Sequence, residues 1–433
     1  MKEKVKRPTQ VMVYPEKKVN NARTTTINLS NKTIKTPCYI PKIRTSKELD
    51  IITDEKKIND YFQGIFFDIL NVSALNREKT IINSKQTRLI PAIKLDFRTL
   101  KGILPIFIDP NTEYLYLNNK QKRKQYRNLP SLPKIISDFL TKSTYANYSK
   151  LWQQLYNAGD TTTIINWNVR EQNKYQPASI IPFTPFIEGE NSPLIDIAID
   201  INKKSAFTIA DTFGLEPSFY FNLNYSALRN LEQLKKITDF LLDADGEYEN
   251  VKMVFIKIKY FQLNDTDVRR NLGKFAKSIQ DAVEFNNKFV FLIDADSYAI
   301  PCISTGFDGF IEPINGYVND YGSSSTPSKF RAYYDKKRME MVKANKIKNK
   351  PLKCGCPRCL KINEVYGGAF FDKIDPQLWS VWCKEHLFYS RCQEVKEIRD
   401  AINDNGINKI QDKFINSAKK DFVEILGYYV DGD

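Results

Sequence analysis

Short apolar segments alternate with helix-like segments through most of the chain. Amphipathic patterns typical of helices occur at Leu132–Tyr156, Ala227–Leu242 and Val268–Phe285. Strands that alternate with helices indicate a parallel sheet built from βα units. Eight strands fit an α/β fold of the (β/α)8 TIM-barrel type, and a doubly wound open sheet is the second possibility. The predicted strands are Cys38–Ile43, Gly64–Leu70, Ile103–Ile108, Ser179–Phe186, Ser218–Leu223, Met253–Tyr260, Phe289–Ile293 and Gly309–Ile314.

The same pattern divides the chain into four parts. The first is polar and lacks periodicity, so we expect a flexible basic arm. The second begins with Thr26-Ile-Asn-Leu and a turn at Ser30-Asn31-Lys32, and it contains all eight predicted strands. The third is a basic insertion, and the fourth holds a cluster of cysteines and a helix predicted at Trp379–Ile402. In order, the parts are residues 1–25, 26–318, 319–353 and 354–433.

The charge of the chain favours an anionic partner. Lysine and arginine total 65 against 51 acidic residues, which gives a net charge of +14. Nucleic acid is the partner that best fits such an excess, although a basic run is also commonly a solvated face. One run lies in the insertion and one follows the third predicted strand. They contain Lys329, Arg331, Lys336, Lys337, Arg338, Lys343, Lys346, Lys348, Lys350 and Lys353, and Lys120, Lys122, Arg123, Lys124 and Arg127.

The start of the chain and its hydropathy predict a cytoplasmic protein with no membrane contact. Met1–Tyr14 has no apolar signal-peptide core, and no apolar run reaches the length that a bilayer requires. Cys38, Cys302, Cys383 and Cys392 show no disulfide framework. GxGxxG and phosphate-loop motifs are absent from the sequence.

The densest chemical signal is Cys354-Gly-Cys356-Pro-Arg-Cys359, followed after 26 residues by His386, the sole histidine. Three thiolates and one imidazole fill the tetrahedral shell that Zn²⁺ prefers. A filled shell leaves no position for water, so the sequence predicts a structural rather than a catalytic zinc. Unpaired thiols beside an unrelated histidine are the alternative.

This Cys3His arrangement resembles the zinc site of the tRNA-guanine transglycosylases. A second similarity is the predicted hairpin from Thr26 that leads through Thr36-Pro37 into the first barrel strand. The resemblance implies a TIM barrel with a C-terminal zinc subdomain. It also implies exchange of guanine in nucleic acid for a 7-deazaguanine base. Most members act on tRNA and the DpdA-like branch acts on DNA; the resemblance leaves open a homodimer or a partner subunit.

Base exchange of this kind needs a carboxylate nucleophile and an acid/base group. Asp109 ends the third predicted strand, where the family places its acid/base aspartate. At the eighth strand, strict alignment with the family motif puts Ile311 at the nucleophile position. A shift of one residue offers Glu312, and Asp308 is the other candidate. Asp294 and Asp296, after the seventh strand, are weaker ones.

The sequence signal for base-binding residues is weaker, because the glycines of the family's pocket motifs are missing. Asn222, Asn224 and Gln262 occupy the corresponding strand ends and could hydrogen-bond a base edge. The eroded tRNA-type motifs favour DNA slightly over tRNA. The alternative function is a non-catalytic, zinc-stabilised nucleic-acid-binding subunit of a transglycosylase or DNA-modification complex, which Ile311 supports.

Overall fold

The fold comes from a computed structural model of the full chain. The residues that it describes are 13–19, 22–29, 32–44, 48–49, 51–52, 62–70, 72, 104–117, 120–243, 248, 250–259, 265–285, 288–294, 298–304, 307–314, 332–336, 340–343, 351–367 and 373–403.

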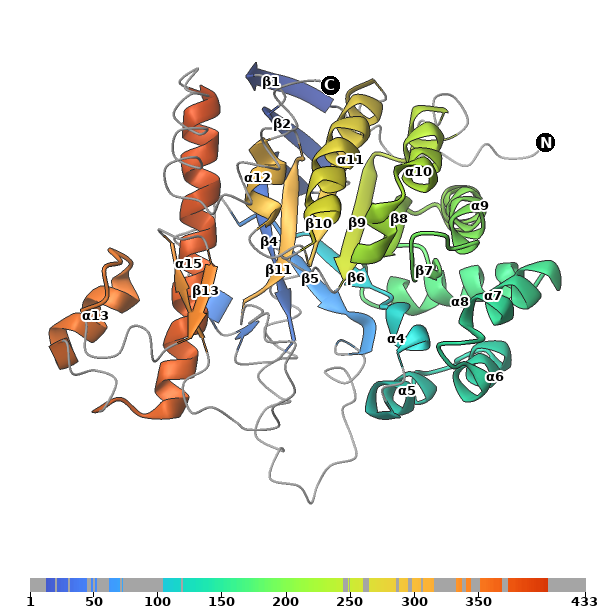
Figure 1. Ribbon diagram of the computed structural model, residues 1–433, viewed down its shortest axis with the longest axis horizontal. Coiled ribbons are helices and arrows are strands. Elements are labelled where there is room, and N and C mark those ends of the chain that lie inside the picture. The colour runs from blue at the N-terminus through green and yellow to red at the C-terminus, as the bar shows by residue number, and fades with distance from the viewer. Residues whose placement is uncertain are drawn as a thin grey trace.

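An eight-stranded parallel sheet forms the centre of the molecule (Figure 1). The sheet curls into a half-barrel that resembles a TIM-like fold. Each of the eight predicted strands contributes to it, but Ser179–Phe186 does so only at Phe186 and through an isolated bridge at Ile180. Its two end strands are β6 and β7. The segment that precedes β7 contacts β6, because the backbone amide of Ala178 donates to the carbonyl of Ile106 at 2.8 Å. In spatial order the strands are β6 (Ile106–Asp109), β5 (Ile65–Asp68), β4 (Cys38–Ile43), β11 (Gly309–Pro313), β10 (Phe289–Ile293), β9 (Met253–Lys259), β8 (Ser218–Asn224) and β7 (Phe186–Ile187).

Helices surround this sheet (Figure 1). Within the described part of the chain, none of them combines the length and the apolar character needed to cross a membrane. They are α4 (Glu113–Tyr116), α5 (Lys120–Arg127), α6 (Lys134–Lys142), α7 (Tyr148–Asn157), α8 (Thr161–Asn173), α9 (Leu194–Phe207) with a π-helical turn at Thr208–Thr212, a 3-10 helix at Tyr225–Arg229, α10 (Leu231–Asp243), α11 (Thr266–Phe285), α12 (Ala299–Ser304), α13 (Pro357–Tyr366) and α15 (Pro376–Asn403).

The single helix predicted at Leu132–Tyr156 is two helices, α6 and α7. The chain leaves the helical conformation at Ser143, whose φ and ψ are −71° and 135°. The buried guanidinium of Arg123 donates to the carbonyl oxygens of Leu140 and Ser143 at 3.3 and 2.7 Å. These carbonyls are among those that a helix end leaves unpaired, so the arginine stabilises the break.

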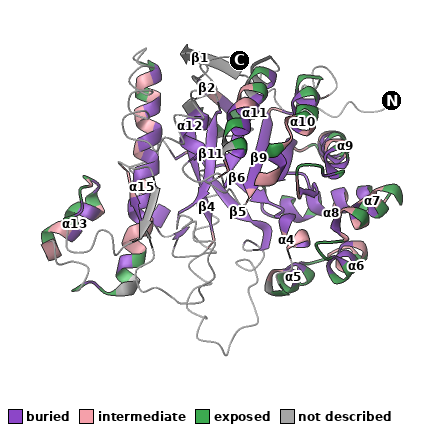
Figure 2. Ribbon diagram, in the orientation of Figure 1, coloured by how far each residue is buried: buried purple, intermediate pink, exposed green. Residues whose placement is uncertain are grey.

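Two apolar cores lie on opposite faces of the curled sheet. The larger one fills the space between the sheet and the helices. The smaller one lies inside the curl, where Phe107, Phe255 and Phe291 pack with ring centroids 5.5 to 5.7 Å apart. Burial of both faces explains why the strands read as continuous apolar runs (Figure 2).

A three-stranded antiparallel sheet covers the amino-terminal end of the half-barrel. It consists of β1 (Val13–Val19), β2 (Ala22–Leu29) and β3 (Lys32–Thr36). Apolar side chains of β2 and β3 join the inner core. The prediction of a flexible arm over residues 1–25 is therefore wrong for β1 and the start of β2. Backbone pairing with β2 holds β1 in place, and a strand of this kind cannot be predicted from apolar periodicity.

Part of the predicted basic insertion is also ordered. Ala332–Asp335 and Glu340–Lys343 form an antiparallel hairpin, β12 and β13. Strand β12 packs against α15, the long helix that also contacts β4. Helix α15 therefore contacts both this hairpin and β4, a strand in the middle of the sheet.

Candidate metal centre and mouth cluster

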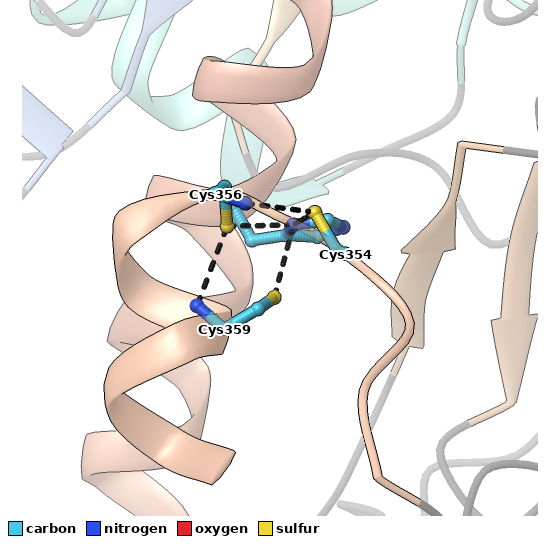
Figure 3. Close-up of side chains that lie close together, drawn as sticks. Cys354, Cys356 and Cys359 are labelled. Atoms are coloured by element: carbon cyan, nitrogen blue, oxygen red, sulfur yellow. Dashed lines mark hydrogen bonds between the residues drawn. The ribbon is translucent and has the colours of Figure 1, made fainter. Parts of the chain in front are cut away.

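The four predicted metal ligands converge on one point. The Sγ atoms of Cys354, Cys356 and Cys359 lie 3.5, 3.3 and 3.4 Å from Nδ1 of His386 (Figure 3). A tetrahedral ion with metal–sulfur and metal–nitrogen bonds of roughly 2.3 and 2.0 Å would hold these atoms about 3.5 Å apart. The distances and the donor set thus fit a metal, and the cluster could hold a metal ion.

The local sequence builds the sulfur side of this centre. Pro357 starts α13, and Cys356 is the residue that precedes it. The backbone amide of Cys359 donates to Cys356 Sγ at 3.3 Å, and that of Cys356 donates to Cys354 Sγ at 3.4 Å. Amide donors stabilise sulfur in its thiolate form, which is the form that binds metal.

Contacts with Tyr333 and Tyr334 orient the histidine. Nε2 of His386 lies 2.7 Å from the carbonyl oxygen of Tyr334, an acceptor that requires the proton on Nε2. Nδ1 is then left free to face the sulfurs. The ring of Tyr333 stacks on the imidazole at 4.3 Å, and its hydroxyl lies 3.4 Å from Cys359 Sγ.

A second constellation lies at the carboxyl ends of the parallel strands. Asp109, the last residue of β6, lies 2.5 Å from Lys257 Nζ on β9 and 3.4 Å from Lys42 Nζ on β4. Asp294, which follows β10, lies 3.2 Å from Lys42 Nζ and also contacts Lys259. We call this group the mouth cluster; it comprises Lys42, Asp68, Asp109, Asn111, Glu113, Asn222, Lys257, Lys259 and Asp294.

The mouth cluster has open hydrogen-bonding groups. Lys257 Nζ donates to Asn111 Oδ1 at 2.6 Å and to Glu113 Oε1 at 2.7 Å, and Asn222 Nδ2 donates to Glu113 Oε2 at 2.9 Å. An ammonium only donates and a carboxylate only accepts, so these contacts fix both amide orientations. Within the described residues, Asn111 Nδ2 and Asn222 Oδ1 then have no partner although both side chains are buried.

Backbone conformation at this edge is unusual. Asn111 and Asp294 follow β6 and β10 with φ values of 51° and 60°. Asn and Asp tolerate this left-handed region better than other residues with a Cβ atom. Such conformations cost energy and are concentrated at functional sites.

The surroundings of the carboxyl groups in the mouth cluster shift their pKa values in opposite directions. Burial would raise the pKa of Asp109, but Lys257 and Lys42 hold it below its usual value. At Asp294 the effect of burial is likewise outweighed. Its pKa is held well below the usual range by Lys259, Lys42 and Lys257. At Asp68, burial prevails and raises the pKa.

The structure brings Asp109, Asn222 and the weaker candidate Asp294 into the mouth cluster, and it separates Glu312, Asp308 and Asn224 from them. Glu312 points away from the inner core: its Oε2 lies 2.9 Å from Arg391 on α15. Asp308 precedes β11, at the opposite end of the sheet, and its Oδ2 accepts from the amide of Val290 at 2.9 Å. Neither acid therefore lies beside Asp109, and Ile311 is the residue of β11 that joins the inner core.

Of the remaining candidates, one caps a helix and two lie outside the described residues. Asn224 accepts the amide of Ser226 and thereby caps the 3-10 helix, rather than pointing into the cluster. Gln262 and Asp296 lie outside the described residues.

The lysines of the mouth cluster, Glu113 and Asp68 were not predicted from the sequence. A signal for two of them exists in Ile256-Lys257-Ile258-Lys259, where lysine alternates with isoleucine in a strand. Alternation places both lysines on the inner face, where they could only be paired. Asp68 offers a similar signal, because it ends the run Ile65-Phe-Phe.

The basic run on α5 proves to be mixed. Arg123 is buried and supports neighbouring carbonyls, so it is not free for phosphate. Lys120, Lys124 and Arg127 are exposed. Of the predicted run in the insertion, Lys336 pairs with Glu397 at 2.7 Å, and most of the others lie outside the described residues.

No protein-family model matches this chain, and no curated protein matches its sequence. The site geometry therefore has to carry any functional assignment.

Proposed function

We propose that the protein is a guanine transglycosylase-like enzyme. It would exchange a guanine in nucleic acid, DNA slightly before tRNA, for a 7-deazaguanine derivative through a covalent glycosyl-enzyme intermediate. The observation that supports this best is the position of Asp109. It lies in a buried cluster of charged groups at the carboxyl ends of curled parallel strands, where TIM-like enzymes place their chemistry.

In this proposal the Cys3His centre binds structural Zn²⁺. All four ligand positions come from the chain, so the ion is bound without an open site. It joins α13 to α15, and α15 packs on β4 and β12. The ion thus stabilises the subdomain next to the sheet and takes no part in the reaction.

Asp109 is better suited to attack the sugar than to donate a proton. Its contacts with Lys257 and Lys42 keep it ionised despite burial. A carboxylate in that state can bond to the anomeric carbon or stabilise the positive charge that develops there. This reverses the acid/base role that the resemblance implies for Asp109.

A second function is also proposed for testing, because a specific observation favours it. Ile311 faces the inner core at the register position of the family's nucleophile, and Glu312 is bound in an ion pair. A chain that kept the scaffold and lost the reaction would look like this at β11. It would act as a non-catalytic nucleic-acid-binding subunit.

Base incorporation separates the two functions. Purified zinc-loaded protein is incubated with labelled guanine or labelled 7-deazaguanine and with either DNA or tRNA. Label entering one polymer, and absent with Asp109→Asn, supports the enzyme. Asp239→Asn, at an exposed position on α10, is the matched control and should retain the activity.

Two further measurements make the result decisive. Urea unfolding shows whether Asp109→Asn is folded at the assay temperature. A binding assay in parallel identifies the second function, which predicts salt-sensitive nucleic-acid binding without incorporation of either base. Wild-type protein that binds in this way but never incorporates label would overturn the proposed enzyme.

A further inference from the structure

Asp68 and Asp109 occupy equivalent places on adjacent strands. They are the last residues of β5 and β6, and they are direct partners in the parallel register. Residues paired in this way point to the same face, and Phe66 and Phe107, two residues earlier, both lie in the inner core. The two carboxyl groups therefore extend from the same edge into the same space.

Their separation suits a paired reaction. Neighbouring strands lie roughly 4.7–4.9 Å apart. Retaining enzymes that cleave glycosidic bonds hold their two carboxyl groups about 5–5.5 Å apart. Asp109 therefore has a second carboxyl at the paired position of the adjacent strand, and the spacing of the two strands is of the order that a double displacement needs.

The contacts of the two groups differ in kind. Asp109 is contacted by two ammonium groups, by Tyr220 OH at 3.0 Å and by the amide of Asn111 at 2.8 Å. Asp68 accepts the amide of Leu70 at 2.8 Å, and Tyr114 OH lies 3.5 Å from its other oxygen. Burial, and to a lesser degree Asp109, raise the pKa of Asp68, although Lys122 and Lys42 act against them. Asp68 in turn contributes to raising the pKa of Tyr126 on α5, whose hydroxyl donates to the carbonyl of Pro110.

We propose that Asp68 is the general acid and base of the reaction, with Asp109 as the nucleophile. The inference rests on the proposed function and deepens it by naming the second catalytic residue. It also replaces Glu312 and Asp308, neither of which points into the mouth cluster.

The proposed steps balance as follows. A carboxylate oxygen of Asp109 bonds to the anomeric carbon of the sugar while the bond from that carbon to the base nitrogen breaks. The electron pair stays on the nitrogen, which takes the proton of Asp68. In the second step the incoming base attacks the same carbon and gives its N–H proton to Asp68, and the bond to Asp109 breaks. Two inversions preserve the configuration.

The open groups near these carboxyls point independently to a ligand. Asn111 Nδ2 can donate and Asn222 Oδ1 can accept, and both are buried and unpartnered within the described residues. A buried polar group without a partner costs about 1–3 kcal/mol. The lactam edge of a guanine-type base carries one acceptor and adjacent donors, which complement a free donor and a free acceptor of this kind.

The test compares two leaving bases. Guanine needs a proton to depart, whereas 7-methylguanine already carries a positive charge and does not. Asp68→Asn keeps the shape and the acceptor for Leu70, so we expect a folded protein. Release of each base from an oligonucleotide, or from tRNA, is measured with zinc-loaded wild type, Asp68→Asn, Asp109→Asn and Asp239→Asn, together with covalent adducts on a denaturing gel.

We expect Asp68→Asn to slow guanine release by about 10²–10⁴-fold. Release of 7-methylguanine should stay near the wild-type rate, and the limb of the pH profile that reports the acid should disappear. Asp109→Asn should form no adduct with either substrate, and Asp239→Asn should behave as wild type.

Each other outcome has a defined meaning. If Asp68→Asn releases guanine at the wild-type rate, or slows the release of both bases equally, Asp68 is not the acid. The proposed function then rests on Asp109 alone. If wild type forms no adduct, releases neither base and incorporates none, the proposed function fails and this inference fails with it.

Discussion

His386 donates from Nε2 to the backbone carbonyl of Tyr334 at 2.7 Å, and this bond joins the candidate metal centre to the rest of the protein. The hydroxyl of Tyr334 lies 2.6 Å from Glu394 Oε1 and 3.0 Å from Arg391. Arg391 in turn pairs with Glu312 on β11. A continuous set of buried polar contacts thus runs from the metal ligands to the strand that closes against β4.

Replacing one ligand should remove the metal and destabilise this region. Cys359→Ser leaves two thiolates and one imidazole, so we expect loss of stoichiometric zinc and a lower Tm, because metal binding contributes directly to folding of such subdomains. Cys383→Ser is the matched control, since Cys383 lies in the same apolar cluster but is not a ligand. Elemental analysis and thermal unfolding provide the measurements. Equal zinc content in the two variants would contradict the assignment.

The ammonium of Lys257 should be essential for stability. Lys257→Met leaves Asp109 and Glu113 buried beside an apolar side chain, and breaking a buried ion pair in this way costs about 3–5 kcal/mol. Lys236→Met is the control, because Lys236 and its partner Asp196 are exposed and such pairs contribute about 0–1 kcal/mol. Urea unfolding of both variants measures the difference. Similar losses would mean that the cluster is not a tightly paired network.

Ionisation of the cluster predicts the pH range of stability. The three lysines hold the pKa of folded Asp294 well below its usual value, so its contribution is complete above about pH 4 and is lost as pH falls towards the folded value. Burial would lower the pKa of Lys257, but Asp109 and Glu113 raise it. Its contribution is therefore complete below about pH 10 and is lost at higher pH.

Asp294→Asn tests the acid side of this range. The variant should be less stable than wild type at neutral pH, and the difference in unfolding free energy should shrink as pH falls below about 4. Denaturant unfolding across a pH series measures it. A difference that stays constant down to low pH would show that Asp294 acts through packing rather than charge.

The strands could be predicted because the sheet is buried on both faces. Segments such as Phe289–Ile293 are apolar throughout, and the predicted and observed bounds agree there. The predicted Ser179–Phe186 strand is largely irregular, with only Phe186–Ile187 in a ladder and a bridge at Ile180. Pro182 and Pro185 lie within it, and proline lacks the amide that a ladder requires.

The two sites differ in how far the sequence could reveal them. The metal ligands were predictable because residue type alone is distinctive and three of them are close in the chain. Lys42 and Lys257 are 215 residues apart, and only curling of the sheet brings both to Asp109. The orientation of Glu312 was equally hidden, because one residue of register decides whether a strand position faces the inner core or the helices.

Exposed basic residues on α5 should contribute to nucleic-acid binding. Lys120 and Lys124 are exposed on α5, which follows α4, and α4 begins with Glu113 of the mouth cluster (Figure 1). Removing one lysine–phosphate ion pair should reduce the slope of log affinity against log salt by roughly 0.9 for duplex DNA. We therefore expect Lys120→Glu/Lys124→Glu to bind DNA or tRNA more weakly, with a slope reduced by up to about 2.

The control must change charge equally at another place. Lys203→Glu/Lys235→Glu does so at exposed positions of α9 and α10, two helices that are separate from α5 (Figure 1). Fluorescence anisotropy at several salt concentrations measures affinity and slope for both pairs. Equal weakening would mean that net charge alone attracts nucleic acid. Weakening confined to the α5 pair would place the polymer beside Asp109, where base exchange requires it.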